Sequence, residues 1–100
     1  MNKFRSLVNY LNEKKLVLAA AESCTAGKIM ATLAQYGDCG ECLFVGYVVY
    51  NEVAKKKLLG VKDSTIAEYT LTSEKVAQEM VQGVFQHEEI NTAIATTGIT

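Results

Sequence analysis

The sequence predicts a three-layer α/β/α domain with a mostly parallel sheet. Two short runs of apolar and small residues, at 16–21 and 92–97, fit strands that are covered on both faces, as strands of parallel sheets are. Stretches with helical periodicity separate the strands and can supply the crossovers that a parallel sheet needs. The expected elements in chain order are a helix at 3–14, a strand at 16–21, a helix at 25–36, a strand at 43–50, helices at 51–59, 64–68 and 73–84, and a strand at 92–97.

The first half of the chain alternates helix and strand. Apolar residues recur every three or four positions in 3–14, which predicts an amphipathic helix. The following run, LVLAAA, is short and ends at a turn signal, which favours a strand, although periodicity alone does not exclude a buried helix. In 25–36, three apolar residues fall on one helical face directly after a very tight turn.

The second half of the chain contains the clearest strand. The segment 43–50, LFVGYVVY, is rich in β-branched and aromatic residues. A helix follows at 51–59 and ends at a glycine. Thr65 and Glu68 have the spacing of a capping box, which favours a short helix, and Ser73 can cap the longer helix after it.

Composition and charge narrow the class of protein. With 100 residues, 49% hydrophobic and 21% charged, the chain is a single folded domain, 1–100, without an internal boundary. A net charge of −1 weighs against nucleic acid and anionic membranes as partners. No segment approaches the roughly 20 apolar residues of a membrane span, and the N-terminus has no signal core. Three cysteines fit a reducing compartment, so we expect a cytoplasmic protein.

The turn between the first strand and the next helix offers nucleophiles. In AESCTAG, Ser23, Cys24 and Thr25 lie at the mouth of a helix, where backbone N–H groups of residues 25–27 can stabilise an oxyanion. Ligands of open α/β sheets bind at such strand ends, and the segments 50–55 and 97–100 occupy equivalent places. Serine and threonine are also common helix caps, and by pattern alone a cap is the commoner explanation.

A serine nucleophile needs a base. The sole histidine, His87, lies in a polar helix end and has the character of a solvated surface residue, which disfavours a Ser-His-acid triad. A lysine with a depressed pKa is the alternative base, and Lys55, one turn into its helix, is the candidate. For any single lysine of the run KKK a surface charge is the ordinary role.

Cysteines give a second, weaker motif. Cys39 and Cys42 have C-x-x-C spacing, but the chain lacks the paired ligand pattern of a zinc site. Redox motifs place the first cysteine at a helix N-terminus after a strand, whereas this pair precedes a strand. We therefore interpret the pair as a coincidence of spacing in a loop. Cys24 lies where a reactive thiol could be. The commoner interpretation of such a cysteine is that it is buried and inert.

Five spaced blocks resemble the CinA competence/damage-inducible family in its C-terminal domain. They are AESCTAG at 21–27, VGYVVY at 45–50, YNEVAKKKLLGV at 50–61, LTSEKVA at 71–77 and TGIT at 97–100. The similarity covers nearly the whole chain and implies a fold like that of the CinA C-terminal domain. In that family the sequence continues with a glycine-rich loop and a further strand, so the remainder of the domain is expected beyond residue 100.

The resemblance implies nicotinamide mononucleotide deamidase activity, the hydrolysis of a linear carboxamide C–N bond that yields nicotinate mononucleotide and ammonia in pyridine-nucleotide (NAD) salvage. It makes Ser23 the nucleophile, Lys55 its base and Tyr50 a residue that positions substrate or the lysine. It implies no metal or other cofactor, a nucleotide as the small-molecule partner, and a homo-oligomer. It also assigns residues to the nucleotide site: Glu22, Thr25, Gly27, Thr97 and Gly98.

Two departures from the family pattern keep an alternative open. Ala26 replaces the commoner first glycine of T-G-G, and Glu52 adds a negative charge near the expected phosphate. These changes are compatible with a catalytically silent paralogue that binds a nucleotide or has a regulatory role. A third hypothesis is a hydrolase that uses Cys24 as the nucleophile.

Overall fold

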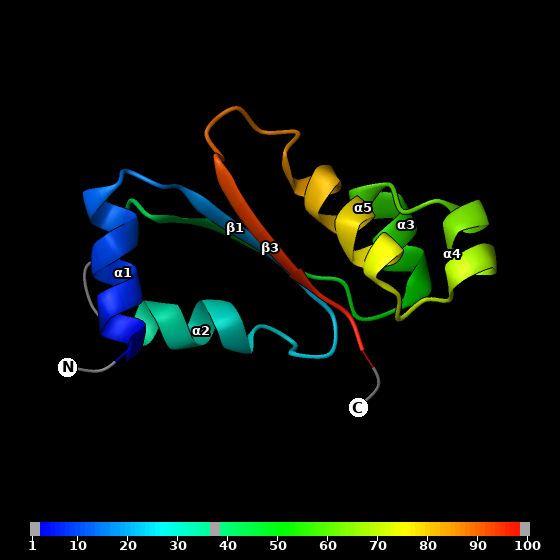
Figure 1. The fold of residues 1–100 in the computed structure, drawn as a ribbon, viewed down its shortest axis with the longest axis horizontal. Helices are drawn as coiled ribbons and strands as arrows, with labels where there is room; N and C mark the ends of the chain where they lie inside the picture. Colours follow the sequence, from blue (N-terminus) through cyan, green and yellow to red (C-terminus); the bar gives the residue numbers. More distant parts are fainter. Residues whose placement is uncertain (1–2, 37–38, 99–100) are drawn as a thin grey trace.

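The structure, a computed structural model, describes residues 3–36 and 39–98. Within these residues the expected order of elements is confirmed, and the helices lie on both sides of a parallel sheet (Figure 1). The elements are α1 (Lys3–Glu13), β1 (Leu18–Glu22), α2 (Lys28–Gln35), β2 (Leu43–Val48), α3 (Glu52–Leu59), α4 (Asp63–Tyr69), α5 (Glu74–Val84) and β3 (Thr92–Thr96).

β1 is the centre of the sheet, whose strand order is β2-β1-β3 with parallel pairing throughout. All five residues of β1 are buried. Glu22, its last residue, is aligned with Val48 of β2 and Thr96 of β3. The carboxyl ends of the strands therefore meet at one edge of the sheet, and whatever follows each strand is brought together there.

The two faces of β1 serve two separate cores. Ala19 and Ala21 face the core formed with α3 and α5, whereas Leu18 belongs to the core formed with α1 and α2. Figure 1 shows these helix groups on opposite sides of the sheet. Because successive side chains of a strand point to opposite faces, an uninterrupted apolar run is what a strand covered on both sides requires.

β3 is less buried than the sequence predicts. Its residues are half-buried or exposed, and Ile94 is 38% exposed. The apolar run predicted a strand covered on both faces, but in the described part of the chain β3 pairs with β1 alone. One face of β3, with Ala93 and Ala95, packs against the core of α3 and α5, whereas Ile94 on the other face lines an open groove beside α1 and α2.

The second helix begins later than predicted. The expected start was near residue 25, but α2 begins at Lys28 because Ala26 and Gly27 have φ values of 49° and 95°. Left-handed backbone cannot continue a right-handed helix, and it costs a non-glycine residue roughly 1–2 kcal/mol. Ala26 therefore carries strain that the commoner glycine would not.

Glu22 supplies the cap that this turn lacks. Gly27, at the N-cap position of α2, makes no side-chain cap. Instead one Glu22 carboxylate oxygen, Oε1, accepts hydrogen bonds from the N–H groups of Gly27 (3.1 Å) and Ile29 (3.0 Å) and from the Thr25 hydroxyl (2.7 Å). Its other oxygen, Oε2, accepts from the Met30 N–H at 3.1 Å. The carboxylate thus satisfies donors that a helix start leaves open.

The short helix α4 is capped differently from the prediction. Thr65 does not form a capping box, because the N-cap residue is Lys62 and the buried Thr65 hydroxyl donates to Glu79 of α5. Glu79 also accepts from the Lys62 N–H at 2.9 Å. Ser73 caps α5 as predicted, accepting from the Val76 N–H at 3.2 Å. None of the helices of the described residues is long and apolar enough to span a membrane.

Replacing Glu22 with glutamine should destabilise the fold. Burial opposes ionisation of Glu22, but the hydrogen bonds from Ile29, Thr25, Met30 and Gly27 outweigh it and hold the pKa of this carboxyl below its ordinary value of 4.5. An amide carries no charge and presents N–H groups to one of these donors, so we expect a loss of about 1.5–3 kcal/mol in urea unfolding at pH 7. The exposed Glu68→Gln variant is the matched control.

The same substitution should change the dependence of stability on pH. The pKa of the Glu22 carboxyl is lower in the folded protein than in the unfolded chain. Its contribution to stability is therefore complete above the unfolded pKa and is lost as the pH falls through the folded pKa. Wild type should therefore lose more stability than Glu22→Gln below about pH 4.5. Parallel stability curves of the two proteins in that range would contradict this role.

Gly83→Ala should weaken the packing of α5 on α3. A Cβ atom at Gly83 would collide with the carbonyl oxygen, Cα and carbonyl carbon of Leu59, which are backbone atoms at the end of α3. Overpacking of this kind typically costs about 1–3 kcal/mol, which urea unfolding measures. The neighbouring Gln82→Ala change, at an exposed position of the same helix, should stay within about 0.5 kcal/mol of wild type.

Candidate active site

Ser23 and Lys55 meet at the carboxyl edge of the sheet. Ser23 follows β1, and Lys55 lies one turn into α3, which Asn51 caps by accepting from the Ala54 N–H at 2.9 Å. The Lys55 ammonium nitrogen, Nζ, donates to Ser23 Oγ at 2.9 Å and, more weakly, to the Tyr50 carbonyl at 3.4 Å. The β1-β2 register and the capped start of α3 together set this contact.

The structure separates Lys55 from its two neighbours. Lys55 is 1% exposed, whereas Lys56 is half-buried and pairs with Asp63 at 2.8 Å and Glu52 at 3.6 Å. Lys57 is exposed. No carboxylate of the described residues lies within ion-pair distance of Lys55. A buried ammonium without a counterion is costly, so the site favours the neutral amine.

The pKa of Lys55 is lowered from its ordinary value. Burial is the main cause, because it penalises the charged form, while Cys24 and Glu52 act in the opposite direction. Ser23 is itself only 5% exposed. When Lys55 is neutral, its nitrogen can accept the Ser23 proton across the same 2.9 Å contact. The pair therefore has the geometry of a nucleophile with its base.

Thr96 holds the nucleophile turn against β3, a role that the sequence analysis missed. The Ser23 N–H lies 3.2 Å from the Thr96 carbonyl and 3.3 Å from its hydroxyl. That hydroxyl is also 2.9 Å from the hydroxyl of Thr25, which in turn donates to Glu22. A threonine inside an apolar run gave no signal of this role, since only the alignment of Thr96 with Glu22 reveals it.

The other predicted site residues lie on the segments around this turn and differ in their contacts. Tyr50 contributes its carbonyl to Lys55, and the residue as a whole is 59% exposed. The Thr97 hydroxyl donates to the Leu71 carbonyl at 3.1 Å, which ties the end of β3 to the segment before α5. A Cβ on Gly98 would lie 3.3 Å from the Cys24 sulfur, so the chain passes close to Cys24. Ile99 and Thr100 of the TGIT block lie outside the described residues.

The expected oxyanion donors are partly engaged elsewhere. The sequence placed the N–H groups of residues 25–27 at the start of a helix, but the Ala26 N–H donates to the Ser23 carbonyl at 3.1 Å and the Gly27 N–H to Glu22. That prediction is wrong for these two groups, because the left-handed turn delays the helix. In residues 3–36 and 39–98 the N–H groups of Cys24 and Thr25 have no protein acceptor.

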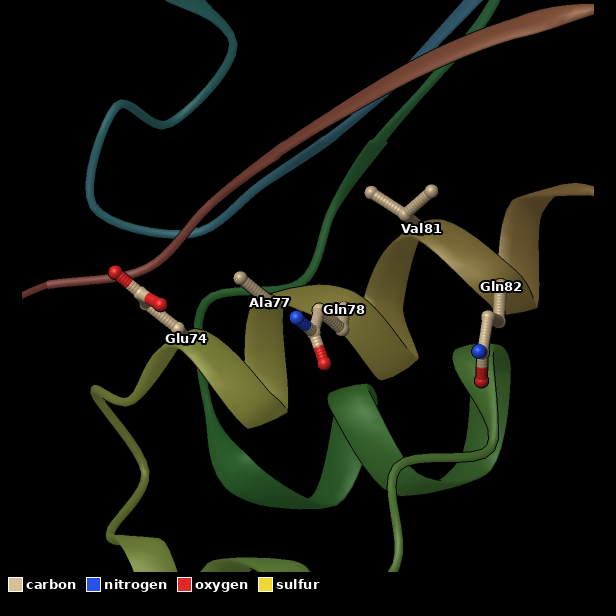
Figure 2. Close-up of a pocket in the computed structure, with 5 residues that line it drawn as sticks. All are labelled: Glu74, Ala77, Gln78, Val81 and Gln82. Atoms are coloured by element: carbon tan, nitrogen blue, oxygen red, sulfur yellow. The ribbon is translucent and has the colours of Figure 1, made fainter.

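Two hollows of the surface lie away from this pair. A hollow of about 490 Å³ runs along α5 and is lined by a carboxylate, two amides and two apolar residues (Figure 2). A second, of about 380 Å³, is an apolar groove between α1, α2 and the sheet. Neither includes Ser23 or Lys55, and neither offers a nucleophile beside a base. The chemistry of the pair, rather than the size of a hollow, identifies the candidate site.

His87 and the cysteines of the described residues lie apart from the Ser23–Lys55 pair or serve other contacts, except for Cys24, which follows Ser23. His87 is exposed, as expected, and its ring nitrogen Nε2 lies 3.2 Å from the Tyr47 hydroxyl. Among the described side chains, no three of His, Cys, Asp or Glu converge as ligands for a metal ion. Cys39 and Cys42 are not in disulfides and are buried in the core of α1 and α2.

Comparison with known proteins identifies the family. The family model of the CinA C-terminal domain matches residues 2–100. A CinA-like protein from Chlorobaculum tepidum is 40% identical over 93 residues, which are 93% of this chain and 22% of that protein. The solved competence or damage-inducible protein from Enterobacter asburiae has 33% identity and a TM-score of 0.90, over 95% of this chain and 60% of that chain.

A CinA superfamily protein from Escherichia coli gives a similar result, with a TM-score of 0.86 and 34% identity over 92% of this chain and 54% of that one. The chain spans about 22% of the length of the curated relatives and little more than half of the solved ones. The TM-scores show that its fold is that of the matched parts of these structures. By sequence and by fold, the chain belongs to the CinA C-terminal domain family.

Proposed function

We propose that the protein is a metal-independent amidohydrolase that converts nicotinamide mononucleotide to nicotinate mononucleotide and ammonia. The observation that carries the proposal is the 2.9 Å contact between two buried groups, Ser23 Oγ and Lys55 Nζ, without a carboxylate beside the lysine. Membership of the CinA C-terminal domain family supports the choice of substrate, because the family resemblance implies this deamidation.

In the first step Ser23 attacks the carboxamide carbon. Neutral Lys55 accepts the hydroxyl proton, and the C–O bond forms as the carbonyl oxygen becomes an oxyanion. The N–H groups of Cys24 and Thr25 are the donors of this turn that remain for that oxyanion. The Lys55 ammonium then gives its proton to the departing amide nitrogen, and the C–N bond breaks to release ammonia.

In the second step water cleaves the acyl-enzyme. Lys55, neutral again, accepts a proton from the water as it attacks the ester carbon, and returns it to Ser23 Oγ when the C–O bond breaks. The product is the carboxylic acid. Around the pair, Glu22, Thr25 and Thr96 hold the backbone of the turn so that Ser23 does not have to be reoriented between steps.

We assign the nucleotide to the surface formed by the three strand ends. Thr25, Gly27, Thr97 and Gly98 lie on the segments that follow β1 and β3, and Tyr50 follows β2. Glu22 lies beneath this surface, because it is 1% exposed, and its oxygens accept hydrogen bonds from the α2 backbone. We also propose that the protein acts as a homo-oligomer in the cytoplasm, as the family resemblance implies.

Ammonia release from the mononucleotide tests the assignment directly. Ser23→Ala and Lys55→Met should each lower kcat on the order of 10²–10⁴-fold, because one removes the nucleophile and the other its base. Lys57→Met, at an exposed position of the same helix, is the control and should retain wild-type activity. Binding of the mononucleotide by wild type without ammonia release would favour a silent paralogue. If Cys24→Ala is inactive and Ser23→Ala remains active, the nucleophile is Cys24.

The pH profile tests the role of Lys55. Because Lys55 must be neutral to act as a base, activity should rise with pH along a titration well below about 10.4, the value of a free lysine. The Glu52 carboxylate raises the pKa of Lys55, so Glu52→Gln should move this rise to lower pH. Asp63→Asn removes the partner of Lys56 and should leave the rise of activity at the pH of wild type. A profile insensitive to Glu52→Gln, or without such a titration, would contradict the role.

A further inference from the structure

Cys39 and Cys42 are brought together in a way that their spacing alone did not predict. Both side chains are buried, at 6% and 1% exposed, and both belong to the core that α1 and α2 form against the start of β1. Their spacing was interpreted as a coincidence within a loop. In the structure the two residues flank a tight turn directly before β2.

The turn places the two thiols within bonding reach of each other. The Leu43 N–H donates to the Cys39 carbonyl at 3.1 Å, which closes one helix-like turn over Gly40 and Glu41. The first and last residues of a four-residue turn have Cα atoms less than about 7 Å apart, and disulfides bridge Cα separations of about 4.4–6.8 Å. The side chains of Cys39 and Cys42 also share a hydrogen bond. A disulfide between Cys39 and Cys42 therefore fits the spacing of this turn.

The surroundings tolerate the oxidised form. The Cys39 thiol donates to the Leu33 carbonyl at 3.1 Å, and that carbonyl also accepts from the Tyr36 N–H at 3.1 Å. When the Cys39 thiol loses its hydrogen, the Leu33 carbonyl therefore still accepts a hydrogen bond from the Tyr36 N–H. The pair packs in this core with Val8, Leu11, Leu18 and Leu33. A disulfide has no polar hydrogen that these apolar neighbours would leave unpaired.

A surface hollow adjoins Cys42, but this residue is 1% exposed, so a small reagent reaches the thiol only when this turn opens locally. Cys42 lines a surface hollow of about 400 Å³ whose wall includes the charged groups of Lys15 and Glu41. The hollow has both charged and apolar residues in its wall, which suits a small polar thiol compound better than an apolar ligand.

We propose that Cys39 and Cys42 form a redox-active dithiol that a low-molecular-weight disulfide, of the class of oxidised glutathione, converts reversibly to an intramolecular disulfide. In the first exchange one cysteine thiolate attacks the reagent, forms a mixed disulfide and releases one thiolate. The second cysteine, as its thiolate, attacks the protein sulfur of that mixed disulfide and releases the second reagent thiolate. The protein loses two protons and two electrons, and the reagent is reduced to two thiols.

The rate of this exchange should rise with pH. Burial, together with the Cys39 side chain, raises the pKa of the Cys42 thiol. Because the thiolate is the attacking species, oxidation is slow at neutral pH and quickens in alkaline buffer. Among the described residues that line the hollow beside Cys42, the charged ones are Lys15 and Glu41, which have opposite signs.

The test treats the purified, reduced protein with oxidised glutathione and measures intact mass, followed by alkylation of the remaining thiols after denaturation. Wild type has three cysteines, none of which is in a disulfide. We expect a mass loss of about 2 Da, one alkylated thiol, a Cys39–Cys42 bridge on peptide mapping, and full reversal by dithiothreitol. Cys24→Ser, which leaves the pair intact, should lose the same mass and retain no alkylatable thiol.

Variants of the pair complete the test. Cys39→Ser and Cys42→Ser cannot form the bridge. Each variant should instead keep a glutathione adduct at the cysteine of the pair that it retains, with no mass loss. Three alkylatable thiols in oxidised wild type, a bridge that involves Cys24, or a disulfide-linked dimer would each overturn the proposal. Wild type and Cys24→Ser decide it even if a serine variant fails to fold, because both retain the buried pair.

Discussion

The buried carboxylate of Glu22 is the constraint on which the candidate site depends. It ends the central strand, and its oxygens hold the N–H groups of Gly27, Ile29 and Met30. Because these bonds start α2 three residues late, the intervening residues form a left-handed turn with Ser23 at its beginning. Thr25 and Thr96 extend the same network to β3. The orientation of Ser23 is thus set by hydrogen bonds that do not include its hydroxyl.

A buried lysine is the second unusual feature, and it opposes stability. Placing an ammonium group at 1% exposure without a carboxylate partner among the described residues is costly, and the protein reduces that cost by favouring the neutral amine. The contact with Ser23 gives the nitrogen one polar partner and the Tyr50 carbonyl gives it another. Polar groups that are costly to bury and have shifted pKa values concentrate at functional sites, which is the physical basis for the proposed assignment.

The two faces of β1 divide the protein into regions of different chemistry. The strand end carries the Ser23–Lys55 pair, while the strand start contacts the Cys39–Cys42 turn, where the Leu18 N–H donates to the Cys42 carbonyl at 2.8 Å. The thiol pair lies in the core of α1 and α2, whereas Lys55 belongs to α3 on the other side of the sheet. The dithiol and the candidate site are therefore separated by the central strand.

The sequence by itself determined the order of the elements, the parallel sheet and the pairing of Ser23 with Lys55 as candidates, because apolar periodicity and spaced motifs are local signals. Tertiary structure alone decided that α2 starts at Lys28, that β3 is half-exposed, that Thr96 supports Ser23, and that Cys39 and Cys42 share a hydrogen bond. Each of these depends on groups from different elements, such as a carboxylate that caps a helix or a register that aligns two strand ends. Local spacing carries no information about such contacts, since they arise only when the strands pair and the helices pack.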